Sequence, residues 1–139
     1  MGTVLGCVVA SAPPVDYQPS DVQLLARMIT AEARGEDEQG QIAVGWVAVN
    51  RARRPSWWGK TLDGVLHKPF QFALSSGFTA AAEMIAAGIL SGDIEDNTSG
   101  ATHFHHGRLP GWAASFIFVG RIGKHQFYRK PGGCEDRAE

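Results

Sequence analysis

LLARMITAEARGE, at residues 24–36, is the stretch around which this chain of 139 residues is organised. Its apolar side chains and one carboxylate recur at helical spacings of three and four, in the set Leu25, Met28, Ile29 and Glu32. Residues at these spacings share one helix face, and this face is apolar until it ends on Glu32. An ionised carboxylate left unpaired on a buried face is costly, so it is either bonded to partners or shifted in pKa. The pattern leaves two interpretations of Glu32 open, a structural carboxylate held by a backbone amide or an arginine, and a general acid.

The composition indicates one globular domain with a single core. Hydrophobic residues make up 44% of the chain, charged residues 19%, and the net charge is −1. This balance gives no sign of nucleic-acid binding, and no apolar run approaches the ~20 residues of a membrane span. We expect an N-terminal arm or remnant of a signal segment at residues 1–19, the domain at 20–130 and a tail at 131–139. The arm lacks a positively charged leader, so it is no clear signal peptide.

The chain contains two cysteines, Cys7 and Cys134, near its two ends. They cannot form a metal site alone, and no C-x-x-C pair occurs. Whether they pair with each other is left open, because a disulfide requires close Cα atoms that a sequence does not show.

Capping signals predict helices in the first two thirds of the chain. Ser20 with Gln23 forms a capping-box pattern for a helix that runs to Arg34, where Gly35 suits a left-handed cap. Pro55 ends a second helix, which starts at residues 36–38 with acidic side chains and finishes with arginines. Two further helices are expected over residues 61–67, capped by Thr61, and over 79–90. The apolar stripe of the last is predicted to be Met84, Ile85 and Ile89.

The sequence pattern changes after residue 100. Short runs of residues there favour strands at 101–106, 116–119 and 125–128. An extended segment is also expected at residues 70–75. Helices followed by a small sheet predict the α+β class.

Five histidines raise the question of a metal. His103 and His105 would project from one face of a strand, and His125 lies on a strand that could pair with it. These three side chains could form a zinc site for a metal-dependent amidase. However, the chain has no His-Glu-x-x-His helix and no cysteine near them, so no metal or cofactor is assigned.

Cleavage of a glycosidic bond fits the residues better. It needs a protonated acid near the leaving oxygen and a cleft that grips sugars through aromatic and amide side chains. Glu32 would supply the acid. The candidate cleft residues are Gln71, Phe72, Phe104, Trp112 and Tyr128, although packing in the core is an alternative for Phe72 and Phe104.

Ordered motifs across residues 21–128 resemble the SleB-type cell wall hydrolase domain of spore cortex-lytic enzymes. The first are Leu25-Ala26-Arg27, Ala31-Glu32-Ala33-Arg34-Gly35-Glu36, Gly40-Gln41-Ile42-Ala43-Val44 and Val49-Asn50-Arg51. The others are Gly64-Val65-Leu66 with Phe70-Gln71-Phe72, Gly100-Ala101-Thr102-His103-Phe104, and Ile122-Gly123-Lys124-His125-Gln126-Phe127-Tyr128.

The resemblance implies a lysozyme-like α+β fold and a lytic transglycosylase that cleaves peptidoglycan between N-acetylmuramic acid and N-acetylglucosamine. The family's catalytic glutamate falls on Glu32. Cleft chemistry and resemblance together assign substrate binding to Gln71, Phe72, Thr102, Phe104, His105 and Tyr128. The sequence departs from the family at His105, where an asparagine is usual, and the segment between Leu74 and Thr79 is short.

The expected partner is the glycan strand of peptidoglycan, with no nucleic acid and no transmembrane span. We expect action in the periplasm or cell wall, after secretion or delivery by a phage, with residues 1–19 as a docking arm for a virion or another partner. The alternatives are a non-catalytic module, which binds peptidoglycan or builds a virion, and the metal-dependent amidase.

Overall fold

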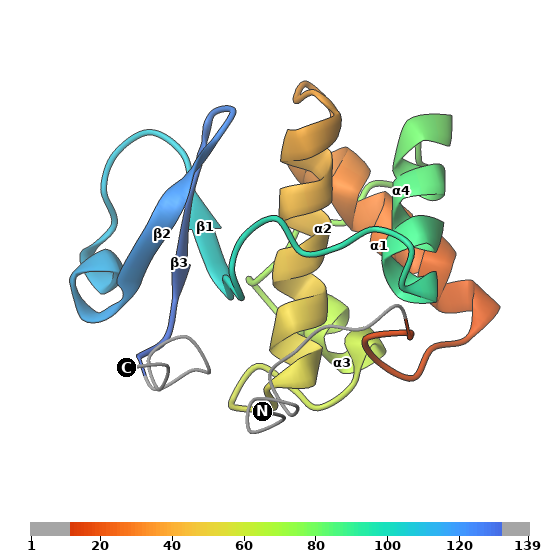
Figure 1. Cartoon of the computed structure of the whole chain (residues 1–139), viewed down its shortest axis with the longest axis horizontal. Coiled ribbons are helices and arrows are strands. Elements are labelled where there is room, and N and C mark those ends of the chain that lie inside the picture. The colour runs from red at the N-terminus through yellow and green to blue at the C-terminus, as the bar shows by residue number, and fades with distance from the viewer. Residues whose placement is uncertain (1–11, 132–139) are drawn as a thin grey trace, which may run out of the picture.

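The computed structural model describes residues 12–131, and it places a helical half before a small sheet (Figure 1). The helices are α1 (Pro19–Ala33), α2 (Glu38–Arg53), α3 (Leu62–His67) and α4 (Ala80–Ser91). The strands are β1 (His103–His105), β2 (Ile117–Ile122) and β3 (His125–Arg129), with a 3₁₀ helix, η1 (Gly111–Ser115), before β2. The predicted α+β class is confirmed. Cys7, Cys134 and most of the predicted arm and tail lie outside the described residues.

α3 begins at its predicted cap, Thr61, and side chains also cap α2 and α4. The N–H of Gly40 donates to Asp37 at the start of α2, and that of Gly64 donates to Thr61 at the start of α3, both at 3.0 Å. Thr79 caps α4 in the same way. The predicted cap of α1 is wrong, because Pro19 already lies in its first turn and Gln18 is the N-cap. There the N–H of Gln18 donates to Asp21 over 2.8 Å.

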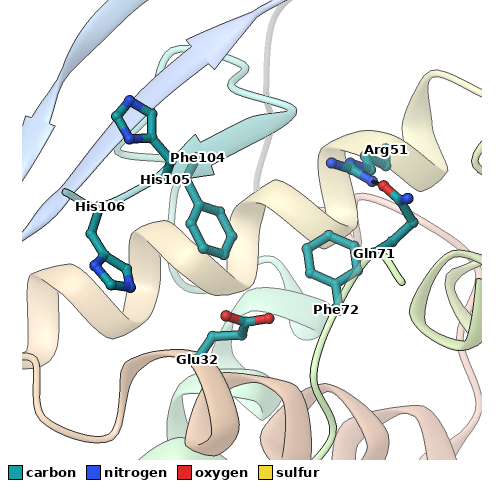
Figure 2. A pocket seen from close by; sticks show the side chains of 7 residues that line it. All are labelled: Glu32, Arg51, Gln71, Phe72, Phe104, His105 and His106. Carbon is teal, nitrogen blue, oxygen red and sulfur yellow. Dashed lines mark hydrogen bonds between the residues drawn. The ribbon is translucent and has the colours of Figure 1, made fainter. Parts of the chain in front are cut away.

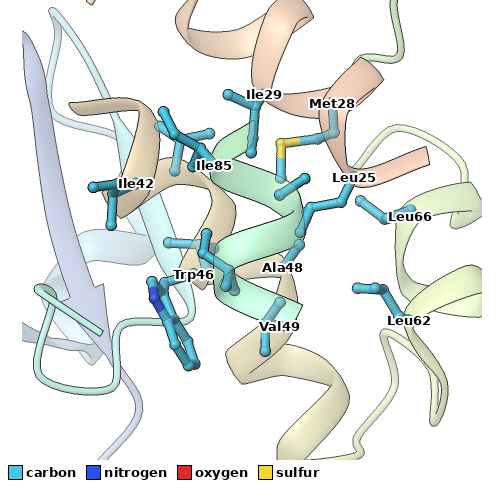
Figure 3. Packing of buried hydrophobic residues seen from close by; sticks show 14 of the residues in the cluster. Leu25, Met28, Ile29, Ile42, Trp46, Ala48, Val49, Leu62, Leu66 and Ile85 are labelled. Atoms are coloured by element: carbon cyan, nitrogen blue, oxygen red, sulfur yellow. The ribbon is translucent and has the colours of Figure 1, made fainter. Parts of the chain in front are cut away.

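The core lies among α1, α2, α3 and α4, and α2 contributes more buried residues to it than any other helix (Figure 3). Gly45 in α2 permits close packing, because a Cβ there would lie 2.9 Å from Ile29 and 2.8 Å from Ile89. On α4, Ile85 and Ile89 are buried as predicted, whereas Met84 is 74% exposed and does not belong to the apolar stripe. No helix within residues 12–131 has the length and apolar character needed to cross a membrane.

The sheet is antiparallel in the order β1-β3-β2 and lies against α2, on the side away from α4 (Figure 1). Its register pairs His103 with Tyr128 and His105 with Gln126. The turn between β2 and β3 rests on the turn between α1 and α2, where the N–H of Lys124 donates to Glu36 over 3.0 Å. This contact fixes one end of the sheet near the C-terminal end of α1.

The expected extended segment at residues 70–75 contains no strand. Its backbone turns at Phe70, which has a φ of 65°, and then runs along α1. Arg27 of α1 holds the segment, because its Nε donates to the carbonyl of Ser75 over 2.7 Å. The segment forms one wall of the cavity described next.

Candidate active site

Glu32 lies in the last turn of α1 and lines a cavity of about 290 Å³ between the helical half and the sheet (Figure 2). The lining residues are Glu32, Arg51, Gln71, Phe72, Phe104, His105 and His106. The carboxylate points into the cavity, toward the rings of Phe72 and Phe104. Three separate parts of the chain therefore meet around one acid.

Burial and hydrogen bonding act on Glu32 in opposite directions. Burial is the larger influence and raises the pKa of the carboxyl, because it penalises the charged form. The N–H of Ala73, which donates to Oε2 over 2.8 Å, and the charge of His106 lower that pKa in part. Glu32 thus combines the two interpretations drawn from the sequence: it is bonded to a backbone amide, and its protonated form is favoured beside a cavity.

Arg51 and Gln71 form the wall at the far side of Phe72. The Nη1 of Arg51 donates to the side-chain oxygen of Gln71 over 3.1 Å, and its Nε donates to the carbonyl of Thr102 over 2.7 Å. The guanidinium carbon lies 4.8 Å from the centre of the Phe72 ring, within the range of a cation–π interaction. The sequence indicated Arg51 as a cation at a helix end and as part of a family motif, and nothing local showed that it would face a cavity.

The opposite wall comes from β1 and the residue that follows it. The rings of Phe104 and His106 point toward Glu32, whereas the ring of His105 points away from it (Figure 2). The ring of His105 stacks on Tyr128 at a centroid distance of 5.5 Å, and its Nε2 lies 3.1 Å from the hydroxyl of Tyr128. The sequence analysis assigned no role to His106, so its place in the cavity was missed.

The structure brings together five of the seven residues that the sequence assigned to the site. These are Glu32, Gln71, Phe72, Phe104 and His105. The other two lie elsewhere. Thr102 is fully buried, with its hydroxyl 3.0 Å from Nδ1 of His103. Tyr128 is 4% exposed and lies behind His105, so it supports the wall and is not part of the lining.

His103 and His125 lie in different surroundings. The ring of His103 packs with Phe116 at 4.3 Å and with Trp112 at 5.1 Å, whereas that of His125 packs with Phe104 at 5.0 Å. Burial lowers the pKa of both rings, that of His103 to about 3. Within residues 12–131 no three histidine, cysteine or acidic side chains are placed to hold a metal ion. The histidines therefore do not come together in the zinc site that the amidase alternative requires.

Known proteins share this architecture. The catalytic domain of the germination-specific lytic transglycosylase SleB from Bacillus anthracis superposes with a TM-score of 0.72 at 26% identity, over 81% of this chain and 97% of that one. The catalytic domain of the Bacillus cereus SleB protein gives a TM-score of 0.73 at 26% identity, over 86% of this chain and 97% of that one. The lysozyme-like fold expected from the resemblance to the SleB family is confirmed by these two catalytic domains.

Sequence relatives point the same way. The spore cortex-lytic enzyme of Halalkalibacterium halodurans is 33% identical over 124 residues, which are 85% of this chain and 37% of the relative. The cell wall hydrolase CwlJ of Bacillus subtilis is 38% identical over 63 residues, 42% of this chain and 44% of the relative. This chain spans less than half the length of either relative.

A family profile described as Cell Wall Hydrolase matches residues 35–128. The matched range begins after Glu32, so it covers both aromatic walls of the cavity but not the acid. It nevertheless spans most of the domain. On this match, the chain belongs to the Cell Wall Hydrolase family.

Proposed function

We propose that this chain is a lytic transglycosylase that cleaves the β-1,4 bond between N-acetylmuramic acid and N-acetylglucosamine in peptidoglycan, with Glu32 as acid and then base. The observation that carries the proposal is the placement of Glu32 in a cavity, with its pKa raised by burial. A raised pKa favours the protonated carboxyl, which is the form that donates to a leaving oxygen. The kinship with spore cortex-lytic enzymes supports the choice of peptidoglycan.

The reaction needs no second carboxylate. Glu32 donates its proton to the glycosidic oxygen, the bond from that oxygen to the muramic C1 breaks, and positive charge develops at C1. The muramic C6 hydroxyl then attacks C1 and returns its proton to the Glu32 carboxylate, which leaves a 1,6-anhydro sugar. Hydrolysis with a water nucleophile usually uses a second carboxylate, but among residues 12–131 Glu32 is the only acidic residue that lines the cavity.

We assign the contacts to the sugar to Gln71, Phe72, Phe104 and His105. The two phenylalanine rings face each other at a centroid distance of 6.4 Å and offer apolar faces for a pyranose. Gln71 offers its amide N–H groups, because its oxygen already accepts from Arg51. The assignment of Thr102 and Tyr128 to direct contact is not retained, because neither lines the cavity.

Turnover of purified peptidoglycan tests the proposal. Glu32→Gln keeps the size of the side chain and an acceptor for the N–H of Ala73, but it removes the proton donor. We expect a loss of at least roughly a hundredfold in rate, the scale of general acid catalysis. Glu83→Gln, on an exposed position of α4, is the matched control and should keep the wild-type rate.

The products decide the mechanism. Mass spectrometry of the wild-type digest should give fragments with anhydro ends, and reducing ends would indicate hydrolysis. Wild-type turnover by Glu32→Gln would contradict the role of Glu32. Absence of turnover by the wild-type chain would favour a non-catalytic module, and loss of activity on chelation would favour the amidase.

Action at the cell wall follows from this substrate. Within that location, the spore cortex is the form of peptidoglycan that the names of the relatives indicate. Delivery by a phage and docking through residues 1–19 stay predictions. Recovery of the chain from purified virions would test them.

A further inference from the structure

A second cavity, of about 450 Å³, adjoins the cavity of Glu32. The two cavities share Arg51, Gln71 and Phe104 as lining residues. The rest of the second lining is aromatic or imidazole, with Trp57, Phe70, Trp112 and Phe116 among its members. A ligand that occupies the first cavity can therefore extend into the second past the Arg51 side chain.

Two aromatic side chains that line the second cavity are exposed to solvent. Trp57 is 56% exposed, and Phe70 is fully exposed. Phe70 also has a φ of 65°, a conformation that is costly for a residue with a Cβ and that persists where the surroundings impose it. The exposed rings present apolar faces to a ligand.

Arg51 places a buried positive charge in the same cavity. It is only 5% exposed, and burial lowers the pKa of its guanidinium to about 10. Its Nε and Nη1 donate to Thr102 and Gln71, both neutral acceptors, and within residues 12–131 Nη2 donates to none. No carboxylate of the described residues forms an ion pair with it. Buried guanidinium groups are ordinarily paired with an anion, and their fork geometry suits a carboxylate.

We propose that the second cavity binds a carboxylate carried by a muramic residue of the glycan, with Arg51 as its partner and with Trp57 and Phe70 against the adjoining apolar atoms. The inference rests on the proposed function and names the substituent of the glycan that the chain recognises. Two sources offer this chemistry: the lactyl ether of a muramic residue without a peptide, and the peptide stem where one is attached. A glycan of N-acetylglucosamine alone offers neither.

Binding to the full chain carrying Glu32→Gln tests the inference without cleavage. Calorimetry would compare glycan strands freed of peptides, the same strands with carboxylates converted to N-methylamides, and strands that keep their peptides with and without the same conversion. We expect conversion to weaken binding by roughly tenfold to a hundredfold, the scale of a charge-assisted hydrogen bond. A loss in the peptide-free pair assigns the lactyl carboxylate, and a loss confined to the peptide-bearing pair assigns the stem.

Two variants in the same background separate the charge from the fold. Arg51→Lys keeps the charge but loses the fork and the bond to Gln71, and it should show most of the same loss. Gln71→Glu places a carboxylate beside Nη1, so it should neutralise the guanidinium inside the protein and abolish the preference for charged strands. Gln23→Glu, an exposed position on α1 outside both cavities, is the matched control and should keep the preference. Thermal unfolding of each variant verifies that it is folded.

The results that test this inference can be distinguished from those that test the proposed function. Equal affinity for charged and converted strands, no binding to any strand, or an undiminished preference in Gln71→Glu would overturn the inference. If the wild-type chain releases anhydro products equally fast from charged and converted strands, only the inference fails. If the preference is found but the wild-type chain cleaves nothing, the inference stands and the proposed reaction fails.

Discussion

Glu32 is a residue at which stability and the proposed activity conflict. Burial raises its pKa above the usual value of 4.5, so the folded protein holds this proton more tightly than the unfolded chain does. The contribution of Glu32 to stability is therefore fully present below pH 4.5 and is lost as pH rises through the folded pKa. An amide at this position would not carry that cost, and an acid is expected there if the group is retained for the proposed reaction.

This conflict predicts that Glu32→Gln unfolds at a higher urea concentration than wild type at pH 7. The gain should shrink on acidification and vanish below about pH 4.5, where Glu32 is neutral in both states. Urea titrations at pH 7, 5.5 and 4 measure it, with Glu83→Gln as the control for loss of a surface charge. A gain that is equal at all three values would mean that burial of the charge is not its cause.

His103 predicts the reverse dependence on pH. Its folded pKa of about 3 lies below the unfolded value of 6.5, so the unfolded chain binds more protons between these values. Stability is present above pH 6.5 and falls as pH drops, by up to about 1.4 kcal/mol for each pH unit from this group. His103→Phe should flatten the fall between pH 6.5 and 4 in denaturant titrations. His67→Gln, on an exposed position of α3, should leave it unchanged.

The individual residues of the site differ in how well the sequence predicts them. Glu32 was found because its helix face is a local pattern with a fixed period. Arg51 and His106 were missed because their place in the cavity depends on β1 lying against α2, a contact between distant parts of the chain. Thr102 was assigned to the cleft through its motif, yet its side chain is buried and hydrogen-bonded to His103. A motif locates a strand without saying which of its side chains meet the substrate.

At the scale of elements, the turn between β2 and β3 depends on a glycine. Gly123 has a φ of 60°, and a Cβ on it would collide with the carboxylate of Glu36. The same carboxylate accepts the N–H of Lys124, so this turn and the end of α1 are joined at one point. A side chain at position 123 would both strain the turn and push it off Glu36.

Gly123→Ala is accordingly expected to lower the free energy of unfolding by about 1–3 kcal/mol. It should also reduce turnover, because the turn fixes the end of the sheet that carries one wall of the cavity. Gly77→Ala is the matched control, since Gly77 lies in open space and is not among the positive-φ glycines. Chemical denaturation and the peptidoglycan assay measure the two effects. Equal stability of the two variants would show that the contact with Glu36 is not required.

Elements were predictable where their signals are local. The cap of α3 at Thr61 was predicted correctly, because its side chain bonds to a backbone N–H only three residues on. The segment at residues 70–75 was expected to be extended, but it carries turns and is held by Arg27 and Glu32, which are far away in sequence. Its conformation follows from those partners.

At the scale of the whole molecule, the α+β architecture was predictable because helices and strands occupy successive parts of the chain. The cavity was not, because it exists only where the two parts meet. Glu32 comes from α1, Phe72 from the segment after α3, and Phe104 from β1. The residue types of a site can be predicted from such a sequence. The walls of its cavity cannot, because they form only when the sheet packs on α2.

The continuity of the helical half, from Pro19 to Ser91, has a kinetic consequence. Contacts between neighbours in sequence form faster than those that close long loops, so helices should assemble before the sheet docks. On dilution from denaturant, we expect far-ultraviolet circular dichroism to recover before the ability to cleave peptidoglycan does. Simultaneous recovery of both signals would contradict this order. A refolding chain would then pass through a stage in which Glu32 is in place but the cavity around it is not formed, and the proposed activity would be absent until the sheet docks.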